Sequence, residues 1–372
     1  MRKLATIRKI DRLSPIEGAD KIELAHTGGW QCVVGKGQFK EGELAIFFEI
    51  DSALPANDER YAFLKDRCYK KWALSNGTIV DECIRIKTAR FKGEISQGLF
   101  MPMDAFDAEL SFPDEELGFN MWPPEGTDVT DELNIRHYDE IAETAMAKTG
   151  KCSLAGDAKG HFPSHIIPKT DEERLQNLTK YFTDPVISEM AFECTEKFDG
   201  SSITMFYDPV DYPEDPFQVC SRNLALKDTA GNKFWQMAKI YDVEQKLRKF
   251  YELDGVCIGI QAELVGPGVN GNRDQYTDYE IRVFRIRDIQ AKRWLTPDER
   301  QMFCQLFELP HVKVMVDNWK VFQDFHSMEE FLEFVKGKTD RGHEREGMVW
   351  KSIDGTVSFK VINNDYLLKQ KD

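Results

Sequence analysis

Short runs of alternating polar and apolar residues dominate the first hundred positions of the chain. The runs LATIRKI, KIELAHT, WQCVVG, ELAIFFEI and ECIRIKTARF are rich in β-branched and aromatic residues, and Gly, Asp or Pro separates them. This pattern is typical of short β-strands joined by turns. It predicts a small OB-like β-barrel over residues 1–104, a kind of module that often binds nucleic acid.

The pattern changes between residues 105 and 165. The stretch PDEELGFNMWPPEGTDVTDEL is acidic and contains prolines, and the run YDEIAETAMAK that follows it predicts a short helix. We therefore expect a connector over residues 105–165.

Strand patterns return in the remainder of the chain. They are AFECTEKF, SSITMFYD, FQVCSRN, CIGIQAELVG, YEIRVFRIRDI, GMVWKS and TVSFKVI, and helical patterns lie between them near residues 232–250, 297–307 and 327–336. This mixture predicts an α+β domain with antiparallel sheets over residues 166–372.

The segment PKTDEERLQNLTKYF predicts a helix at the start of this second domain. Pro168 lies outside it, Thr170 can cap its first turn, and Glu173, three residues later, completes a capping box.

Composition excludes several classes of protein. No apolar run reaches the roughly 18 residues needed to span a bilayer, and the N-terminus lacks the apolar core of a secretion signal. The eight cysteines form no CxxC pair, which argues against zinc sites and disulfides and favours buried thiols in a cytoplasmic protein. The formal net charge of −15 excludes a basic coat over the whole surface but allows a local positive cleft.

Four cations follow one another in RIKTARFKGEISQGLF. Arg85 and Lys87 are two residues apart and would point to one face of a strand, and Arg90 and Lys92 come next. The row could bind RNA phosphates, or it could be a solvated edge strand whose charges prevent aggregation. The residues alone leave both interpretations open.

The stretch TEKFDGSSIT, residues 195–204, places Lys197 just before an Asp-Gly turn between two strands. A K-x-D-G match alone occurs by chance in about one chain of this length in ten, and a surface lysine would explain it. However, further motifs follow in order: SRN at 221–223, IQAELVG at 260–266, RVFRI at 282–286, REGMVWK at 345–351 and SFKVI at 358–362.

In order and rough spacing, these motifs resemble those of the covalent nucleotidyltransferases, the superfamily of polynucleotide ligases and mRNA capping enzymes. The segments PKTDEERLQN, ELVGPGVNGN, EGMVWK and SFKVINNDYLLK are most similar to ATP-dependent RNA ligases of the Deinococcus radiodurans type, which seal nicks with a 3′-OH and a 5′-phosphate. Those proteins also carry an N-terminal OB-like module. The resemblance therefore implies an adenylation domain over residues 166–372 and an RNA-binding module over residues 1–104.

The implied activity uses ATP and Mg²⁺ or Mn²⁺. Lys197 would attack the α-phosphorus of ATP to form lysyl-AMP, AMP would pass to the RNA 5′-phosphate, and the 3′-OH would then expel AMP. The attacking amine must be neutral, so neighbouring cations and a metal are expected to lower the pKa of Lys197. The RNA would be a nicked duplex or a structured RNA, and no protein partner is evident.

By the same resemblance, the catalytic residues are Lys197, Glu346 and Lys360, and Lys360 contacts the α-phosphate. The implied nucleotide contacts are Glu196, Lys197, Arg222, Glu263, Lys360 and Phe284, the last of which stacks on adenine. The implied metal carboxylates are Asp199, Glu263 and Glu346, because hard oxygen ligands suit Mg²⁺. Arg174, on the predicted helix, corresponds to an arginine that contacts the 5′-phosphate end of the RNA.

Taken alone, several of these residues have simpler interpretations. Phe284 alternates with arginines and is typical of a core position, Glu346 lies in a charged run typical of a solvated loop, and Arg222 and Arg174 could be surface cations. Glu263 differs, because its strand IQAELVG is apolar and a buried carboxylate without a partner is costly. That cost favours a functional role for Glu263.

One departure from the superfamily pattern concerns its last motif, which often has two lysines as KxK. Here the first position is Ser358 and only Lys360 remains, which leaves Lys351 or Lys369 as substitutes. DNA ligases and capping enzymes share the lysine chemistry, but they carry a further C-terminal OB domain, and this chain ends about a dozen residues after Lys360. The alternative from another class is a nonenzymatic RNA-binding protein with a decayed ligase domain.

Overall fold

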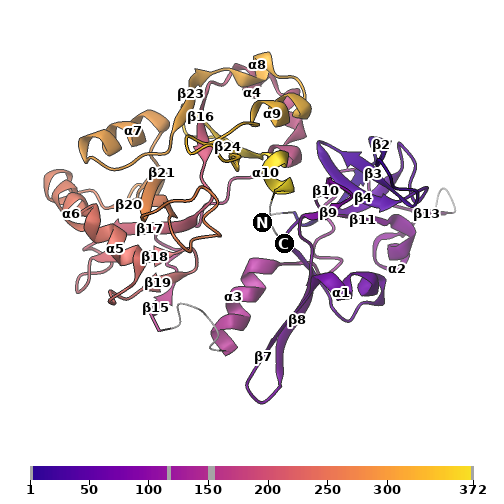
Figure 1. The fold of residues 1–372 in the computed structure, drawn as a ribbon, viewed down its shortest axis with the longest axis horizontal. Helices are drawn as coiled ribbons and strands as arrows, with labels where there is room; N and C mark the ends of the chain where they lie inside the picture. The colour runs from indigo at the N-terminus through magenta and orange to yellow at the C-terminus, as the bar shows by residue number, and fades with distance from the viewer. Residues whose placement is uncertain (1–2, 115–118, 150–155, 370–372) are drawn as a thin grey trace. The chain divides into compact units, whose positions relative to one another are not determined.

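The computed structural model describes residues 3–114, 119–149 and 156–369. The chain divides between residues 155 and 156 into two compact units. Figure 1 shows the first unit in indigo to magenta and the second in magenta to yellow. Among the described helices, none combines the length and the apolar character that crossing a bilayer requires.

Short antiparallel sheets build most of the first unit. One sheet has the strand order β1-β5-β11, another β2-β3-β4, a third β14-β6-β8-β7, and two further pairs are β9 with β10 and β12 with β13. The strands are β1 (Ala5–Lys9), β2 (Arg12–Pro15), β3 (Ile22–Thr27), β4 (Trp30–Gly35), β5 (Leu44–Phe48), β6 (Ser52–Leu54), β7 (Tyr69–Ala73), β8 (Ile79–Arg85), β9 (Ala89–Phe91), β10 (Glu94–Ser96), β11 (Leu99–Pro102), β12 (Phe112–Asp114), β13 (Phe119–Met121) and β14 (Arg136–His137). The helices are η1 (Glu59–Leu64), α1 (Lys65–Cys68), η2 (Met103–Phe106), α2 (Asp107–Leu110) and α3 (Tyr138–Thr149).

Strand β5 is the centre of this unit because it is buried on both faces. Phe47 packs with Trp30 and Phe100 in one core cluster, whereas its neighbour Phe48 packs with Tyr61 in another. Successive side chains of a strand point to opposite faces, so the continuous apolar run LAIFF is what a strand between two cores requires.

The described residues between 105 and 149 belong to the first unit and share its core. Phe106, Leu133 and Ile135 belong to the core cluster that contains Phe48, and β14 pairs with β6. Helix α3 forms where the run YDEIAETAMAK predicted one. Ala145 of this helix is buried in a smaller core cluster that also contains Trp72.

The predicted strand carrying both Arg85 and Lys87 is wrong. Strand β8 ends at Arg85, and Lys87 follows it in an irregular segment. Arg85 pairs with Asp51 at 2.7 Å, and its guanidinium lies 4.0 Å from the ring centroid of Tyr138. These contacts hold Arg85 within its own unit. Because β8 ends at Arg85, alternation along the strand does not extend to Lys87 and does not place both side chains on one face.

Two antiparallel sheets form the second unit. A seven-stranded sheet has the order β15-β19-β18-β17-β20-β21-β22, and a four-stranded sheet has the order β23-β16-β24-β25. The strands are β15 (Ala158–His161), β16 (Phe192–Lys197), β17 (Ser201–Tyr207), β18 (Phe217–Ser221), β19 (Leu224–Leu226), β20 (Ile258–Val265), β21 (Glu280–Asp288), β22 (Arg293–Trp294), β23 (Val314–Trp319), β24 (Gly347–Ser352) and β25 (Ser358–Ile362). The helices are η3 (Leu175–Asn177), η4 (Thr179–Phe182), α4 (Pro185–Glu189), α5 (Lys233–Ile240), α6 (Val243–Asp254), α7 (Pro297–Leu306), α8 (Val321–Asp324), α9 (Met328–Phe334) and α10 (Asn364–Leu368).

Aromatic packing fastens the helices to the four-stranded sheet. Phe331 of α9 lies 5.5 Å from Trp350 of β24 and 5.9 Å from Phe359 of β25, measured between ring centroids. Trp350 and Phe359 are themselves stacked at 5.2 Å. All three rings are fully buried, so they fix the sheet whose edge residues reach the site described below.

The prediction of a helix that follows Pro168 and is capped by Thr170 is wrong. Residues 168–174 are extended, and only the short helices η3 and η4 follow. The backbone N–H of Lys360 donates to the carbonyl of Glu173 at 2.8 Å, and the hydroxyl of Thr170 bonds to Gln261 instead of capping a helix. Pairing with β25 therefore takes the backbone groups that a helix would have used.

A buried ion pair joins helix α7 to strand β16. The guanidinium of Arg300 donates to the carboxylate of Glu193 at 2.7 Å, and both side chains are almost fully buried. Gln301 donates to the same carboxylate at 2.7 Å, and Arg300 Nε contacts His311 Nε2 at 2.7 Å.

We expect Glu193→Ala to lower the free energy of unfolding by about 3–5 kcal/mol, because it leaves the buried charge of Arg300 without its partner. Urea unfolding followed by circular dichroism measures this loss. The double variant Glu193→Leu/Arg300→Leu, which removes both charges, should lose less. A single variant as stable as the unchanged protein would show that the pair does not hold α7 in place.

Candidate active site

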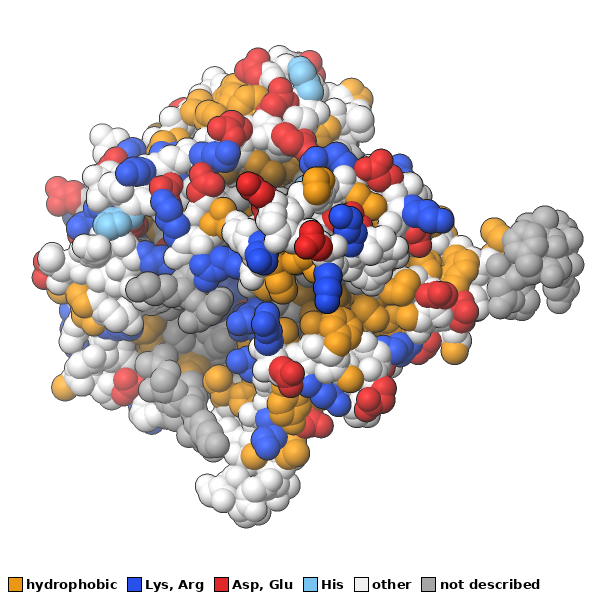
Figure 2. Space-filling model, turned by 45° about the vertical axis from the view of Figure 1, so that its right-hand side comes forward, with side chains coloured by type: hydrophobic (Ala, Val, Ile, Leu, Met, Phe, Trp, Pro, Cys, Tyr) orange, Lys and Arg blue, Asp and Glu red, His pale blue; other side chains and the backbone are white. Residues whose placement is uncertain are grey.

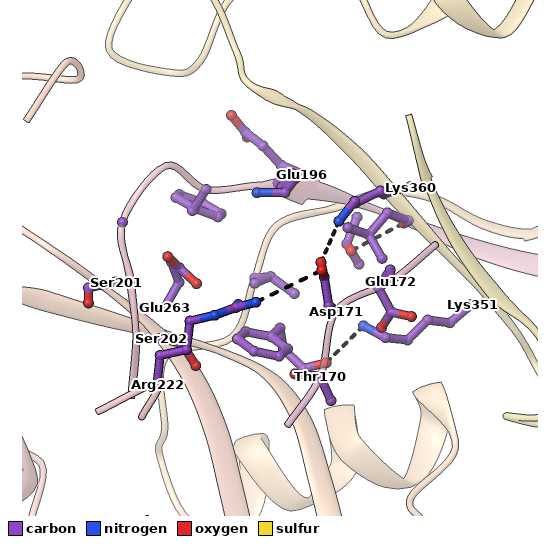
Figure 3. Close-up of a pocket in the computed structure, with 17 residues that line it drawn as sticks. Thr170, Asp171, Glu172, Glu196, Ser201, Ser202, Arg222, Glu263, Lys351 and Lys360 are labelled. Carbon is purple, nitrogen blue, oxygen red and sulfur yellow. Dashed lines mark hydrogen bonds and ion pairs between the residues drawn. The ribbon is translucent and has the colours of Figure 1, made fainter. Parts of the chain in front are cut away.

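A cavity of about 310 Å³ lies where the two sheets of the second unit meet (Figure 3). Both sheets and the extended segment after Pro168 contribute to its walls. The lining residues are Thr170, Asp171, Glu172, Thr195, Glu196, Lys197, Phe198, Gly200, Ser201, Ser202, Arg222, Glu263, Phe284, Val312, Val349, Lys351 and Lys360.

Lys197, which lines this cavity, is paired with Glu346, which is not among the lining residues. Strand β16 ends at Lys197, which pairs in register with Gly347, the first residue of β24. Glu346 directly precedes that strand, and its Oε1 accepts a hydrogen bond from Lys197 Nζ at 2.6 Å. The register of the sheet thus brings together two side chains that are 149 positions apart.

The Asp-Gly turn after Lys197 needs its glycine. A Cβ at Gly200 would lie 2.3 Å from the carbonyl oxygen of Leu264 and 2.9 Å from Glu263 Cγ. Only a residue without a side chain allows the turn to approach β20 this closely. This approach places Glu263, which pairs with Ser202, beside Lys197.

Buried carboxylates dominate the electrostatics at this end. Burial raises the pKa of Glu263 to about 8, although the charge of Lys197 opposes the shift. Burial also raises the pKa of Glu346. For Lys197, burial favours a lower pKa, but Glu346 and Glu263 outweigh it and the net shift is upward. The expected lowering by neighbouring cations is therefore not a property of the protein alone.

A β-bulge aims Phe284 into the cavity. Across β20 and β21, Gln261 pairs with Arg285 whereas Ala262 pairs with Val283, so Phe284 is the extra residue between them. A bulge reorients a side chain and interrupts the ladder. The backbone carbonyl of Phe284 instead accepts hydrogen bonds from Lys351 Nζ at 3.0 Å and from Arg300 at 3.3 Å.

Two cations lie around a carboxylate in the same cavity. Lys360 Nζ pairs with Asp171 at 2.5 Å, and the guanidinium of Arg222 lies 3.9 Å from the other oxygen of that carboxylate. Figure 3 shows Asp171 between the two. An anion is therefore favoured at this position, and a phosphate could take the place of the carboxylate. Asp171 could not be identified from the sequence, because one acidic residue in a charged run carries no signal.

Asp199 does not line the cavity in the described structure, although a role at the metal was predicted for it. Its carboxylate accepts hydrogen bonds from the hydroxyl of Tyr366 on α10 and from the amide of Asn270 in the loop after β20. Arg273 of that loop lies 3.7 Å from the same carboxylate and 4.3 Å from the ring centroid of Tyr366. Tyr366 is thus a residue that sequence reasoning missed, since nothing in NNDYLLK marks it.

The remaining predicted residues lie as follows. The carboxylate of Glu196 points away from the cluster in Figure 3, as alternation along β16 requires, and it is buried. Arg174 is buried beside the bridge that its backbone makes with Lys360. Ser358 bonds to Glu172, and Lys369 pairs with Glu344 at 2.7 Å outside the cavity. Neither Lys351 nor Lys369 is positioned like Lys360. Lys351 bonds to the carbonyl of Phe284, and Lys369 bonds to Glu344.

The residues present fit a divalent cation together with a phosphate ligand. In the part of the chain that the structure describes, no group of three or more His, Cys, Asp or Glu residues forms a ready metal cage. Within that same part, Glu346 Oε2 is buried without a hydrogen-bond partner, close to the carboxylate of Glu263. Mg²⁺ usually binds through one or two carboxylates, retained waters and substrate phosphates, which suits Glu346 and Glu263.

The buried side chain of Lys351 should make the free energy of unfolding depend on pH. Burial, aided by the charge of Arg300, lowers the pKa of Lys351 to about 7. Between that value and the ordinary pKa of about 10.4, the unfolded chain binds more protons than the folded one, so stability rises with pH. Between about pH 7 and about pH 9 we expect a rise of about 2 kcal/mol in the free energy of unfolding, which should be absent in Lys351→Met. Urea unfolding at about pH 7 and about pH 9 measures it, and the exposed Lys369→Met is the control. Equal pH dependence in Lys351→Met and the unchanged protein would contradict this account.

Comparisons with known proteins agree with this arrangement. A family model described as an OB-fold domain matches residues 4–103, and one described as RNA ligase matches residues 190–362. The search of curated proteins found no match.

Solved structures of an RNA ligase from Naegleria gruberi are similar over the whole chain. A lysine-to-methionine mutant with AMP and Mn has 34% sequence identity, covers 100% of both chains and gives a TM-score of 0.75. A lysine-to-alanine mutant with ATP and Mn has 33% identity, covers 99% of both chains and gives the same score. The matches confirm the predicted fold, an N-terminal OB-fold domain followed by a ligase domain. Because the chain is similar to these ligases over its whole length and has a cavity around Lys197, it belongs to the RNA ligase family.

Proposed function

We propose that this protein joins RNA ends in an ATP-dependent reaction that passes through AMP bound covalently to Lys197. The observation that carries the proposal is the hydrogen bond of 2.6 Å between Lys197 and Glu346. Lys197 lines the cavity together with Glu263, Phe284 and Lys360. The Naegleria ligase structures that match this chain contain ATP or AMP together with Mn, which supports ATP and a divalent cation as its ligands.

In the first step, Lys197 Nζ attacks the α-phosphorus of ATP. The new P–N bond replaces the bond to pyrophosphate, which leaves with the electron pair of the broken P–O bond. Glu346 accepts the hydrogen bond from Nζ and is placed to take the proton that the amine must lose. A divalent cation at Glu346 and Glu263 would supply positive charge that offsets these carboxylates and favours the neutral amine.

The nucleotide is held from two sides. Phe284, reoriented by the bulge, offers its ring to adenine, and the hydrogen bonds from Lys351 and Arg300 to its carbonyl fix its backbone. Lys360 and Arg222, at present on either side of Asp171, would bind the α-phosphate. Their charges stabilise the negative charge that develops during transfer.

Two further transfers complete the joining. An oxygen of the RNA 5′-phosphate attacks the phosphorus of lysyl-AMP, which breaks the P–N bond and returns Lys197. The 3′-OH of the other end then attacks the activated 5′-phosphate, a phosphodiester bond forms, and AMP leaves. Each is an in-line phosphoryl transfer that depends on positioning and charge.

The finer assignment is to ligases of the Deinococcus type, with 3′-OH and 5′-phosphate ends in nicked duplex or structured RNA. The full-length similarity to a ligase with an N-terminal OB-fold supports it. Arg174 would contact the 5′-phosphate end, and Lys87, Arg90 and Lys92 of the OB-fold domain would contact RNA phosphates. We place the protein in the cytoplasm, since the cysteines that the structure describes are all free thiols.

Labelling tests the proposal directly. Incubation with α-labelled ATP and Mg²⁺, followed by denaturing electrophoresis, should leave label on the unchanged protein and none on Lys197→Ala, because the nucleophile is gone. Chelation of the metal should abolish labelling. The exposed Lys369→Ala is the matched control and should be labelled normally. Equal labelling of Lys197→Ala and the unchanged protein would refute the proposal, and preference for GTP would indicate a capping enzyme.

Tyr366→Phe should slow lysyl-AMP formation about 10- to 100-fold, because the carboxylate of Asp199 loses a charge-assisted hydrogen bond and the turn beside Lys197 loses its anchor. Single-turnover labelling measures the rate. Tyr212→Phe, in the core beside Phe206, is the control and should retain full rate. A normal rate in Tyr366→Phe would mean that α10 does not contribute to the site.

A further inference from the structure

Exposed aromatic rings and cations occur together on one projecting part of the first unit. Phe63 of η1 is 63% exposed, and Tyr69, the first residue of β7, is 37% exposed. Arg67, Lys70 and Lys71, which flank Tyr69, are also exposed. We call these five residues, with the β7–β8 hairpin that carries three of them, the basic arm. The hairpin projects from its unit at the bottom of Figure 1.

The acidic residues of the arm leave its cations available. Asp81 is bound by Arg136, whose two guanidinium nitrogens each lie 2.9 Å from its oxygens, and Glu82 accepts the hydroxyl of Tyr69. Across the described residues, no carboxylate lies within ion-pair distance of Arg67, Lys70 or Lys71. The arm is therefore locally positive in a chain whose net charge is −15.

A cation from another part of the sequence lies at the same place. Lys87 follows β8, and its charge acts on the thiol of Cys68 together with those of Arg67 and Lys70, against the burial that raises the pKa of that thiol. Lys87 thus acts on the same thiol as Arg67 and Lys70, although it is about twenty positions away in the sequence. In Figure 2, Lys and Arg side chains lie beside hydrophobic ones along the projection at the bottom of the molecule.

This combination is costly for a surface that binds nothing. Phe63 exposes an aromatic ring that folding usually buries, and Leu74 and Ile79 nearer the hairpin tip are 39% and 49% exposed. Rings next to unpaired cations are the arrangement by which proteins bind single-stranded nucleic acid, since bases stack on the rings while the cations neutralise phosphates. A duplex cannot use the rings, because its bases are already stacked on one another.

We propose that the basic arm binds a single-stranded segment of the RNA substrate, with bases stacked on Phe63 and Tyr69 and phosphates bound by Arg67, Lys70, Lys71 and Lys87. This rests on the proposed function for the identity of the substrate and adds where, and in what form, the RNA is held. The ligase cavity recognises the end to be joined, whereas the arm would hold unpaired RNA that flanks this end.

Binding of a fluorescent oligouridylate to the full-length protein tests the proposal, with an RNA duplex of equal phosphate number as the second probe. Arg67→Ala/Lys70→Ala/Lys71→Ala should weaken oligouridylate binding at least about 10-fold at low salt and reduce the slope of log affinity against log salt by about 2. Phe63→Ala/Tyr69→Ala should weaken oligouridylate binding at least about 5-fold and leave duplex binding unchanged.

Lys36→Ala/Lys40→Ala removes two exposed lysines elsewhere in the same unit and is the matched control, expected to bind normally. The substituted side chains are exposed. Circular dichroism reports that each variant is folded, and lysyl-AMP formation reports that the adenylation function is intact. Unchanged oligouridylate binding in either arm variant would overturn the proposal, and so would equal losses of oligouridylate and duplex binding in Phe63→Ala/Tyr69→Ala. Loss of labelling in all proteins, the unchanged one included, would count against the proposed function instead.

Discussion

The antiparallel pairing of β16 with β24 is the constraint on which the site depends. Its register sets Lys197 opposite Gly347 and so brings the ammonium group to the carboxylate of Glu346, next to the end of the strand. A shift of one residue would turn every side chain of β16 to the opposite face and place Glu196 in the cavity instead of Lys197. The stack of Trp350 on Phe359 joins β24 to β25 within the sheet, and the buried pair of Glu193 with Arg300 joins β16 to helix α7. Both contacts support this register.

The site has carboxylates at the end where Lys197 meets Glu346 and cations at the other end. Carboxylates at one end raise the pKa of the lysine, and the cations Lys360 and Arg222 at the other end attract an anion. A nucleotide fits this division, with its phosphate toward the cations and a metal ion toward the carboxylates. The protein alone therefore holds Lys197 in its protonated form, and the ligands must supply the charge that frees the amine. Such coupling would prevent the nucleophile from reacting before ATP and metal are bound.

Much of the fold could be predicted from alternation alone. Periodicity and turn residues predicted most of the longer strands, the helices after Asn232 and the antiparallel α+β arrangement. They did not predict β7 or β23. The helix expected after Pro168 failed because its capping residues are local signals, whereas pairing with β25 is a contact across the whole domain. The OB-fold and the ligase motifs were confirmed, since each depends on short segments whose spacing the sequence displays.

The parts of the site that could not be predicted arise from distant contacts. The bulge at Phe284 leaves one trace, the three-residue step from Val283 to Ile286 in an otherwise alternating strand, but its consequence for the ring needs the register of β20. Tyr366 acquires its role only because α10 reaches Asp199.

Lys197, placed by this register, is the residue to which the nucleotide should be bound. Peptide mass spectrometry of the full-length protein after incubation with ATP and Mg²⁺ can locate the modification. We expect a single AMP, labile to acid, on the peptide that contains Lys197. AMP on Lys351 or Lys360, with Lys197 unmodified, would show that Lys197 is not the nucleophile.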